Sequence, residues 1–364
     1  MKKITILLPD MREGGVEKMR LILAKEWRAH YDVEFLLLSK RGGLLELIPK
    51  DIRVTVLNVT RYRMLLPSLV RYIRQEQPEV ILAAMWPLTV VAALATKLSL
   101  QKTMCVISDH GILSAQYQPK GKWHDLSLRA SMALSYRLSD EVVAVSKGVA
   151  KDISTLASLP LESIKVIYNP ASKIDLDELQ TRSPFAINDG LAIITVGRYK
   201  KVKNHALLIE AFALVREKVT AKLYIVGDGD LRSEYETLIE SLNLQQDVVL
   251  TGFVNDPSAY YTHADLFVLS SDYEGFGNVI VEAMDAGTPV VATDCECGPR
   301  EILEGGKYGA LVPVGDIEAL ASAMLESLAQ KHDYEALKCH ASTFSVAKIS
   351  AQYLAIMFPD IHHQ

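Results

Sequence analysis

Short runs of valine, isoleucine and leucine recur along the whole chain and are separated by longer stretches with helical periodicity. Strands that alternate with helices form parallel sheets whose two faces are both covered. The alternation is interrupted by the polar stretch 175–190, which has the composition of a domain linker. We therefore predict two doubly wound, Rossmann-like α/β domains with an interdomain cleft. The expected strands are 3–8, 33–38, 54–57, 80–84, 103–107, 141–145, 164–167, 191–196, 222–226, 248–250, 266–269, 290–292 and 309–312.

The composition is that of a soluble globular protein, with 49% hydrophobic and 23% charged residues among 364. The apolar stretch 4–9 is too short for a signal peptide. The longest uncharged run, 80–96, is interrupted by Pro87, so we interpret it as a strand and a core helix rather than a bilayer span. The four cysteines lack the spacing of a zinc site or a disulfide framework. These features predict a reduced, cytoplasmic setting.

Charge is distributed unevenly along the chain. Residues 1–182 carry a formal net charge of +7 and residues 183–364 a charge of −12. A basic half favours an anionic partner, such as a membrane surface or a phosphate-bearing substrate. Nucleic acid is disfavoured, because the basic residues are dispersed and the sequence has no aromatic-basic motif of an RNA-binding module.

Glycine-rich turns follow three of the expected strands. Gly14 and Gly15 open a helical stretch, where backbone amides can approach an anion, although a tight turn explains them equally well. Gly227 and Gly229 bring the main chain close to a partner, but Arg232 stands where a dinucleotide fingerprint needs a third glycine. A nicotinamide enzyme is therefore disfavoured.

The remaining glycine turn carries cations. Gly197 and Arg198 follow the strand 191–196, and Lys203 comes five residues later at the start of a helical pattern. A guanidinium offers forked donors and an ammonium offers a mobile point charge, and both suit a diphosphate. The two lysines between them are interpreted as solvated surface.

The most informative constellation is the pair Glu274 and Glu282, which flanks the loop 275–278. Two glycines in that loop disfavour a helix through Glu274, so we expect Glu274 in a loop and Glu282 in the second turn of the helix that follows. A loop carboxylate suits sugar hydroxyls, one on the helix can accept both hydroxyls of a ribose, and the helix N-terminus stabilises a phosphate. A helix cap with an incidental buried glutamate is the alternative interpretation.

These residues together resemble the signature of the retaining glycosyltransferases of family 4, which have the GT-B fold. The resemblance spans nearly the whole chain and is carried by segments 14–15, 145–147, 197–204, 227–229 and 273–292. Segment 294–303 resembles members that extend bacterial surface glycans such as lipopolysaccharide and O-antigen. The resemblance implies an acceptor-binding domain over 1–182, a nucleotide-sugar-binding domain over 183–345, and a terminal helix in 346–364 that crosses back to the first domain.

The resemblance also implies roles for individual residues. Arg198 and Lys203 would stabilise the leaving diphosphate, Glu274 would position the transferred sugar, and Glu282 would hold the ribose. The leaving phosphate would take the proton of the acceptor, so no carboxylate need act as a nucleophile. No metal or other cofactor is expected, because enzymes of this fold usually need none. The other implied donor-binding residues are Gly15, Gly197, Gly275, Phe276, Gly277, Asn278 and Val279.

His110 follows the expected strand 103–107. Family members often place a polar side chain from this loop near the donor sugar, so we expect His110 to be catalytic, with Asp109 orienting its imidazole. The alternative is a structural histidine whose two ring nitrogens are both satisfied.

The segment 61–74 sets arginines and tyrosines beside apolar residues in the basic half of the chain. This is typical of a helix on a membrane surface. It is also typical of an ordinary amphipathic helix packed on the first sheet, and the sequence leaves both interpretations open.

The sequence thus predicts a retaining hexosyl- or N-acetylhexosaminyltransferase. Its partners would be a nucleotide sugar, with UDP favoured, and a lipid-linked oligosaccharide of bacterial cell-surface polysaccharide synthesis. We expect peripheral contact with the inner face of the cytoplasmic membrane. Two other functions stay open, namely a GT-B nucleotide-sugar epimerase and a non-catalytic protein that binds glycans or nucleotide sugars.

Overall fold

The computed structural model describes residues 1–12, 14–59, 62–117, 121–170, 182–186 and 190–359. By its contacts the chain divides into two compact units. Unit 1 comprises Met1–Pro170 and Val346–Gln364, and unit 2 comprises Ala171–Ser345. Each unit holds one parallel sheet, which confirms the predicted pair of Rossmann-like domains. Most of the predicted linker 175–190 lies outside the described residues.

The unit 1 sheet has the strand order β3-β2-β1-β4-β5-β6-β7, and all of its neighbouring strands are parallel. Its strands are nearly continuous runs of buried apolar residues, as expected for a sheet that is covered on both faces. The chain leaves β1 in one direction along the sheet and returns beside it with β4, which makes this pair the topological switch point. The strands are β1 (Lys3–Leu8), β2 (Asp32–Leu37), β3 (Arg53–Val56), β4 (Val80–Ala84), β5 (Met104–Asp109), β6 (Glu141–Ala144) and β7 (Ile164–Val166).

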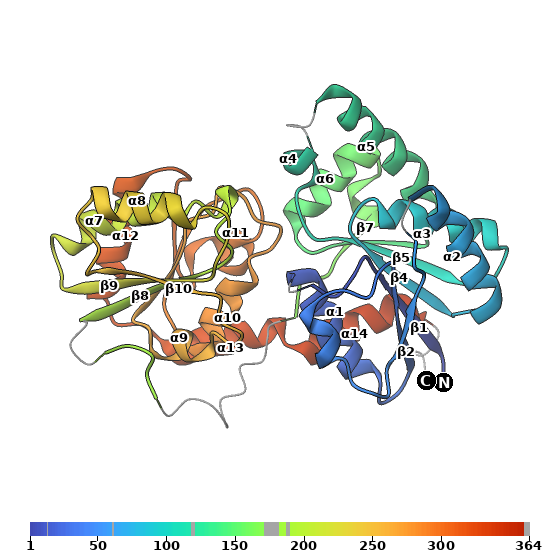
Figure 1. Ribbon diagram of the computed structural model, residues 1–364, viewed down its shortest axis with the longest axis horizontal. Helices are drawn as coiled ribbons and strands as arrows, with labels where there is room; N and C mark the ends of the chain where they lie inside the picture. Colours follow the sequence, from blue (N-terminus) through green and yellow to red (C-terminus); the bar gives the residue numbers. More distant parts are fainter. Residues whose placement is uncertain (13, 60–61, 118–120, 171–181, 187–189, 360–364) are drawn as a thin grey trace. The chain divides into compact units, whose positions relative to one another are not determined.

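Helices cover both faces of this sheet. Figure 1 shows α2 and α3 on one side of the strands and α1 with α14 on the other. The C-terminal helix α14 packs on α1, where Trp27 Nε1 donates to Ser350 Oγ at 2.8 Å and the Trp27 ring meets Tyr353 edge-on. The helices are α1 (Gly15–Trp27), α2 (Tyr62–Glu76), α3 (Leu88–Ser99), α4 (Leu113–Tyr117), α5 (Lys122–Ser135), α6 (Lys147–Ala157) and α14 (Val346–Met357).

The unit 2 sheet has the order β10-β9-β8-β11-β12-β13, so its switch point lies between β8 and β11. Figure 1 shows α7, α8 and α12 over one face of this sheet and α9, α10 and α13 over the other. The strands are β8 (Leu191–Val196), β9 (Ala221–Val226), β10 (Val248–Gly252), β11 (Leu266–Leu269), β12 (Val290–Thr293) and β13 (Ala310–Val312). The helices are α7 (His205–Arg216), α8 (Arg232–Ser241), α9 (Ser258–His263), α10 (Asn278–Ala286), α11 (Pro299–Ile302), α12 (Ile317–Ala329) and α13 (Tyr334–Ala341).

Every strand predicted from the sequence is present, with its ends displaced by at most two residues. The run 80–96 forms β4 and the buried helix α3, as predicted. None of the helices within the described part of the chain has the length and apolar character that a bilayer-spanning segment requires.

Candidate active site

The switch point of unit 2 brings two of the predicted loops together. The loop that carries Gly197, Arg198 and Lys203 leaves the carboxyl end of β8, and the loop that carries Glu274 leaves the carboxyl end of β11. These two strands are neighbours in the sheet. Diverging loops at a switch point leave a crevice at the sheet edge, which is the usual ligand position in open α/β sheets.

Lys203 and Glu274 meet directly at this edge. Lys203 Nζ lies 2.6 Å from Glu274 Oε1, and both side chains are partly exposed. The Ser271 hydroxyl donates to the same carboxylate oxygen at 2.6 Å. The arrangement holds a cation and an anion side by side where solvent, or a charged ligand, has access to both.

The two loops are also joined through their main chains. The Ser270 hydroxyl donates to the carbonyl of Lys203 at 2.9 Å, and the amide of Asp272 donates to the carbonyl of Val202 at 2.8 Å. The Asn204 side chain, which caps α7, donates to Asp272 Oδ1 at 2.8 Å. These bonds fix the position of Lys203 relative to Glu274, so that a ligand meets a preformed pair of charges.

The turn after β9 contains Gly227 and Gly229 because larger residues would clash with a neighbouring loop, which could not be seen from the sequence. A Cβ atom on Gly227 would lie 2.0 Å from the carbonyl oxygen of Gly197, and one on Gly229 would lie 2.7 Å from that of Tyr199. The main chain that Gly227 and Gly229 approach is therefore the β8 loop of the same unit. A Cβ on Gly197 would meet Lys203 only at ordinary contact distance, and Arg198 is exposed.

Helix α10 begins at the expected place. Gly277, with φ +103°, ends the loop, and Asn278 is the first residue of the helix. Glu282 therefore lies in the second turn, where its Oε2 accepts a hydrogen bond from the Tyr261 hydroxyl at 2.8 Å. Burial, together with the Glu282 charge, raises the pKa of Tyr261 well above its ordinary value, so the phenol stays a donor.

The loop between Glu274 and α10 is anchored to the core of unit 2 by the side chain of Phe276. The Phe276 ring is buried and meets Phe344 edge-on, with ring centroids 5.6 Å apart. Gly275, Asn278 and Val279 are partly exposed. Phe276 thus contributes its backbone to the edge and its ring to the core.

In unit 1, Gly14 and Gly15 stand at the start of α1, in the connection that follows β1. A Cβ on Gly14 would lie 2.1 Å from Glu17 Oε2, because the carboxylate of Glu17 folds back over this turn. Gly15 is exposed. The Glu17 carboxylate therefore lies close to the first glycine, and the second is exposed at the helix N-terminus.

His110 stands just beyond β5 and contacts Ser108, which is itself bonded to Arg20. His110 Nε2 lies 3.0 Å from Ser108 Oγ, which also accepts a hydrogen bond from Arg20 Nη2. Arg20 is fully buried, and its guanidinium lies 5.0 Å from the ring centroid of Tyr353. Burial and the Arg20 charge lower the pKa of His110 well below its ordinary value, while a bond with Asn169 opposes this shift. The imidazole is therefore neutral at physiological pH.

The expectation that Asp109 orients His110 is wrong. Successive residues of a strand point to opposite faces of the sheet, so Asp109 faces away from Ser108. Asp109 Oδ2 instead accepts a hydrogen bond from the Tyr136 hydroxyl at 2.7 Å. Burial raises the pKa of Asp109 to about 7.

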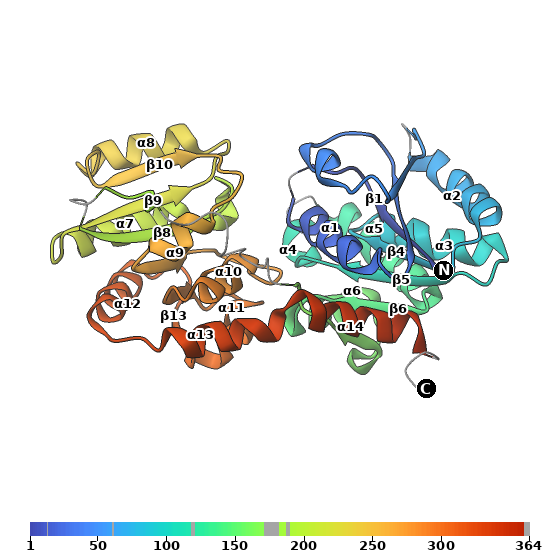
Figure 2. The same cartoon turned by 90° about the horizontal axis from the view of Figure 1, so that it is seen from below.

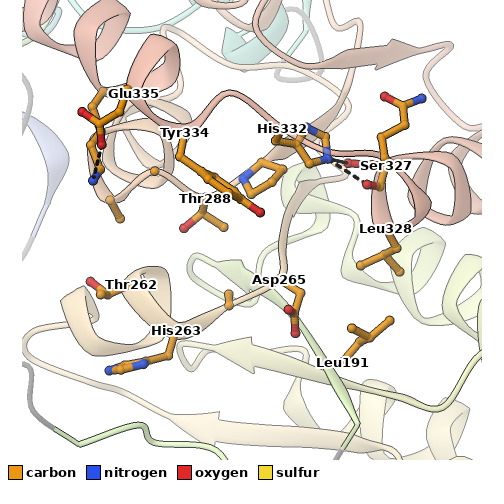
Figure 3. A pocket seen from close by; sticks show the side chains of 16 residues that line it. Leu191, Thr262, His263, Asp265, Thr288, Ser327, Leu328, His332, Tyr334 and Glu335 are labelled. Carbon is orange, nitrogen blue, oxygen red and sulfur yellow. Dashed lines mark hydrogen bonds and ion pairs between the residues drawn. The ribbon is translucent and has the colours of Figure 1, made fainter.

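A cavity of about 570 Å³ lies at the other edge of the unit 2 sheet (Figure 3). Leu191 is the first residue of β8, and Asp265 and Pro289 directly precede β11 and β12, so the cavity borders the amino ends of the strands. In Figure 3 the Asp265 and Tyr334 side chains line it, and His332 bonds to Ser327 beside it. None of the residues predicted from the sequence lines this cavity.

The predicted membrane segment 61–74 forms most of helix α2, but Arg61 lies outside the described residues. Within α2, Tyr72 is buried and its hydroxyl bonds to Glu34 and Thr5. Arg74 donates to carbonyl groups at the end of α3. These contacts are typical of an amphipathic helix that packs on its own domain.

Comparison with known proteins identifies the family of the chain. The family profile "Glycosyltransferase Family 4" matches residues 13–172, and "Glycosyl transferases group 1" matches residues 178–343. A Campylobacter jejuni protein, N-acetylgalactosamine-N,N'-diacetylbacillosaminyl-diphospho-undecaprenol 4-alpha-N-acetylgalactosaminyltransferase, is 33% identical over 72% of each chain. The chain belongs to glycosyltransferase family 4. It is a glycosyltransferase of the GT-B fold.

Two other relatives of the enzyme extend this result. The lipopolysaccharide core biosynthesis glycosyltransferase LpsE of Rhizobium meliloti is 29% identical over 89% of this chain and 83% of its own. The crystal structure of Anabaena Alr3699/HepE in complex with UDP and glucose superposes with a TM-score of 0.81, at 25% identity over 97% of this chain and 98% of that chain.

Several side chains that contact the predicted site residues were not found from the sequence. Ser271 lies two residues after β11 and precedes Glu274, and a polar residue just beyond the carboxyl end of a strand was a usable signal. Tyr261 and Arg20 gave no local signal. Tyr261 reaches Glu282 from another helix, and Arg20 reaches Ser108 across 88 residues of sequence.

Proposed function

We propose that this glycosyltransferase transfers a hexosyl or N-acetylhexosaminyl unit, with retention of anomeric configuration, from a nucleotide sugar to a lipid-linked glycan. The favoured donor is a UDP-sugar, and the setting is the synthesis of a bacterial cell-surface polysaccharide at the inner face of the cytoplasmic membrane. The Campylobacter relative is named for a diphospho-undecaprenol acceptor, and the Anabaena structure contains UDP and glucose. Both facts support these choices.

The contact between Lys203 and Glu274 at the unit 2 switch point carries the proposal. In the proposed reaction the bond between the anomeric carbon and the diphosphate oxygen breaks, and the nucleoside diphosphate leaves with the electron pair. Lys203 and Arg198 stabilise the negative charge that develops on the leaving oxygen. Glu274 holds Lys203 in place and accepts hydrogen bonds from the sugar hydroxyls.

The remaining partners complete the proposed transfer. The acceptor hydroxyl forms the new bond to the anomeric carbon, and its proton passes to the leaving phosphate. Glu282, oriented by Tyr261, accepts bonds from the ribose. His110 is a neutral imidazole that offers a hydrogen bond without a charge. No metal ion takes part in the proposed reaction.

The test is a donor screen with UDP-, GDP- and ADP-sugars, read by nucleotide release with and without a lipid-linked glycan acceptor. We expect release with one donor class to depend on the acceptor, to persist with a chelator, and to fall sharply in Arg198→Ala. Turnover of the nucleotide sugar without an acceptor would instead identify an epimerase. Binding without turnover, unchanged by Arg198→Ala, would identify a non-catalytic protein.

A further inference from the structure

The cavity of about 570 Å³ at the amino edge of the unit 2 sheet takes no part in the proposed transfer. All of its lining residues belong to unit 2, and it borders the amino ends of strands whose carboxyl ends lead to Lys203 and Glu274. The last residues of α9 and α10 and the first residues of α13 form part of its wall, and Figure 2 shows these three helices next to one another. Its volume lies within the range of about 300–1,000 Å³ that is usual for small-molecule sites. We call it the amino-edge cavity.

Asp265 offers a carboxylate oxygen to the amino-edge cavity. Its Oδ2 accepts a hydrogen bond from the amide of Ala192 at 2.7 Å, and its own amide donates to the Ala192 carbonyl at 2.9 Å. These two bonds fix the orientation of the carboxylate. The other oxygen, Oδ1, has no hydrogen bond or ion pair within the described residues, and Asp265 is exposed. A carboxylate only accepts hydrogen bonds, so this position favours a ligand that donates them.

Tyr334 offers an aromatic ring and a hydroxyl to the same cavity. Its side chain is 54% exposed and lines the cavity in Figure 3. The hydroxyl has no hydrogen-bond partner in the part of the chain that the structure describes. Leu191, Leu328 and Pro289 add apolar surface to the lining. A ligand therefore meets an apolar wall and two polar groups that are open to hydrogen bonding.

The charges of the lining exclude two classes of ligand. Among the described lining residues Lys338 is the one lysine or arginine, and its Nζ lies 3.2 Å from Glu335 Oε1. A phosphate or a nucleotide would therefore meet the Asp265 carboxylate without a free lysine or arginine to offset its charge. A purely apolar ligand would cover that carboxylate without giving it a hydrogen bond. The lining suits an uncharged ligand with several donors.

We propose that the amino-edge cavity binds an uncharged pyranose and is a second sugar site, separate from the donor site. The hydroxyls of the sugar donate to Asp265 Oδ1 and exchange hydrogen bonds with the Tyr334 hydroxyl. The C–H face of the sugar lies on the Tyr334 ring, and Leu191 and Leu328 cover its remaining apolar surface. An amine would use the carboxylate alone, whereas a pyranose uses the carboxylate, the hydroxyl and the apolar wall together.

The inference goes beyond the proposed function, because the cavity shares no residue with the proposed donor site and needs no nucleotide. A free sugar and a sugar within a longer glycan present the same hydroxyls and the same C–H face. Methyl α-glucoside is the probe for a single sugar, and maltose presents two linked pyranoses. Tighter binding of maltose would identify a glycan as the source, and equal binding would identify a single sugar. Both results support the site.

The test titrates the full-length protein with each probe, without a nucleotide sugar, and follows binding by saturation-transfer NMR. We expect dissociation constants of about 1 mM, because the ligand is small and the site is exposed. Tyr334→Ala and Asp265→Asn should each weaken binding about fivefold or more. Asparagine keeps an oxygen for the Ala192 amide and Tyr334 is exposed, so thermal unfolding of both variants should match the parent.

Trp123→Ala is the matched control, because Trp123 is an aromatic side chain of unit 1 with 85% exposure. It should bind both sugars like the parent, and so should Lys203→Ala. Parent-like binding by either Tyr334→Ala or Asp265→Asn, or an equal loss in Lys203→Ala, would overturn the inference. So would an absence of sugar binding, or tighter binding of putrescine or inorganic phosphate than of either sugar. Absence of nucleotide release with every donor would refute the proposed function alone, since this sugar binding needs no donor.

Discussion

At the carboxyl edge of the unit 2 sheet, the charged side chains of Lys203 and Glu274 are partly exposed and paired, whereas at the end of β5 in unit 1 Asp109 and His110 are shifted toward their neutral forms. Lys203 and Glu274 lie 2.6 Å apart within reach of solvent. In unit 1, burial raises the pKa of Asp109 and lowers that of His110. The first edge is suited to a charged diphosphate, and the second is suited to uncharged hydrogen bonds.

The difference follows from where the side chains sit on their strands. In unit 2 the functional residues lie on loops beyond β8 and β11, where water and ligands have access. In unit 1, Ser108 and Asp109 are the last residues of β5 itself and are covered on both faces. A group inside the layers loses hydration and favours its neutral form. Similar folds can therefore present a charged and a neutral edge.

Among the variants of the charged edge, Lys203→Ala should lower activity the most. We expect kcat/KM for sugar transfer to fall about 100- to 1,000-fold, or about 3–4 kcal/mol, because the variant lacks the ammonium that stabilises the leaving diphosphate in the proposed reaction. Steady-state nucleotide release measures the effect, and thermal unfolding shows whether the fold is retained. Lys200→Ala is the control, since Lys200 lies in the same loop and is exposed. Equal losses in the two variants would contradict a specific role for Lys203.

The neutral edge is tested by Asp109→Asn. The folded-state pKa of Asp109 is about 7, above that of an unfolded chain, so the folded protein keeps a proton that the unfolded chain has released. The associated stability is present below about pH 4 and is lost as the pH rises through about 7. Asparagine cannot ionise. The variant should therefore gain about 1–3 kcal/mol relative to the parent between pH 5 and pH 8, measured by urea unfolding.

If the difference in the free energy of unfolding between Asp109→Asn and the parent did not change with pH, the carboxyl group would already be charged in the folded protein. The unit 1 edge would then not favour a neutral Asp109. Ser108→Ala serves as a reference, because Ser108 is equally buried and carries no titratable group. Its effect on stability should not change over the same pH range.

Much of this arrangement could be predicted from the sequence because it depends on local patterns. Apolar runs marked the strands, and the glycines around Glu274 correctly placed it in a loop ahead of the helix that carries Glu282. Lys203 and His110 were chosen as candidate site residues because each lies in a connection that follows an expected strand. These features need only the periodicity of strands and helices and the conformational preferences of glycine.

The parts that could not be predicted depend on packing between distant segments. The Arg20 side chain reaches from α1 to Ser108 on β5, and no sequence pattern relates the two residues. The alternation of side chains along β5 could have been used to predict that Asp109 points away from His110. The hydrogen bond from Tyr136 to Asp109 could not be predicted, because it depends on how α5 and the turn after it pack.

The smallest expected effect concerns Tyr261→Phe, which sharpens the comparison at the charged edge. The variant lacks the hydroxyl that donates to Glu282 Oε2 at 2.8 Å. We expect a loss of about 1 kcal/mol in folding stability and a rise of about fivefold in the KM for the donor, with kcat nearly unchanged. In the proposed function Glu282 binds the ribose, and such a contact contributes to binding in the ground and transition states alike. Tyr353→Phe is the matched control in unit 1, since the buried Tyr353 hydroxyl has no hydrogen-bond partner within the described residues. Tyr353→Phe should leave both folding stability and KM close to those of the parent. A fall in kcat at unchanged KM in Tyr261→Phe would instead assign Glu282 to the chemical step.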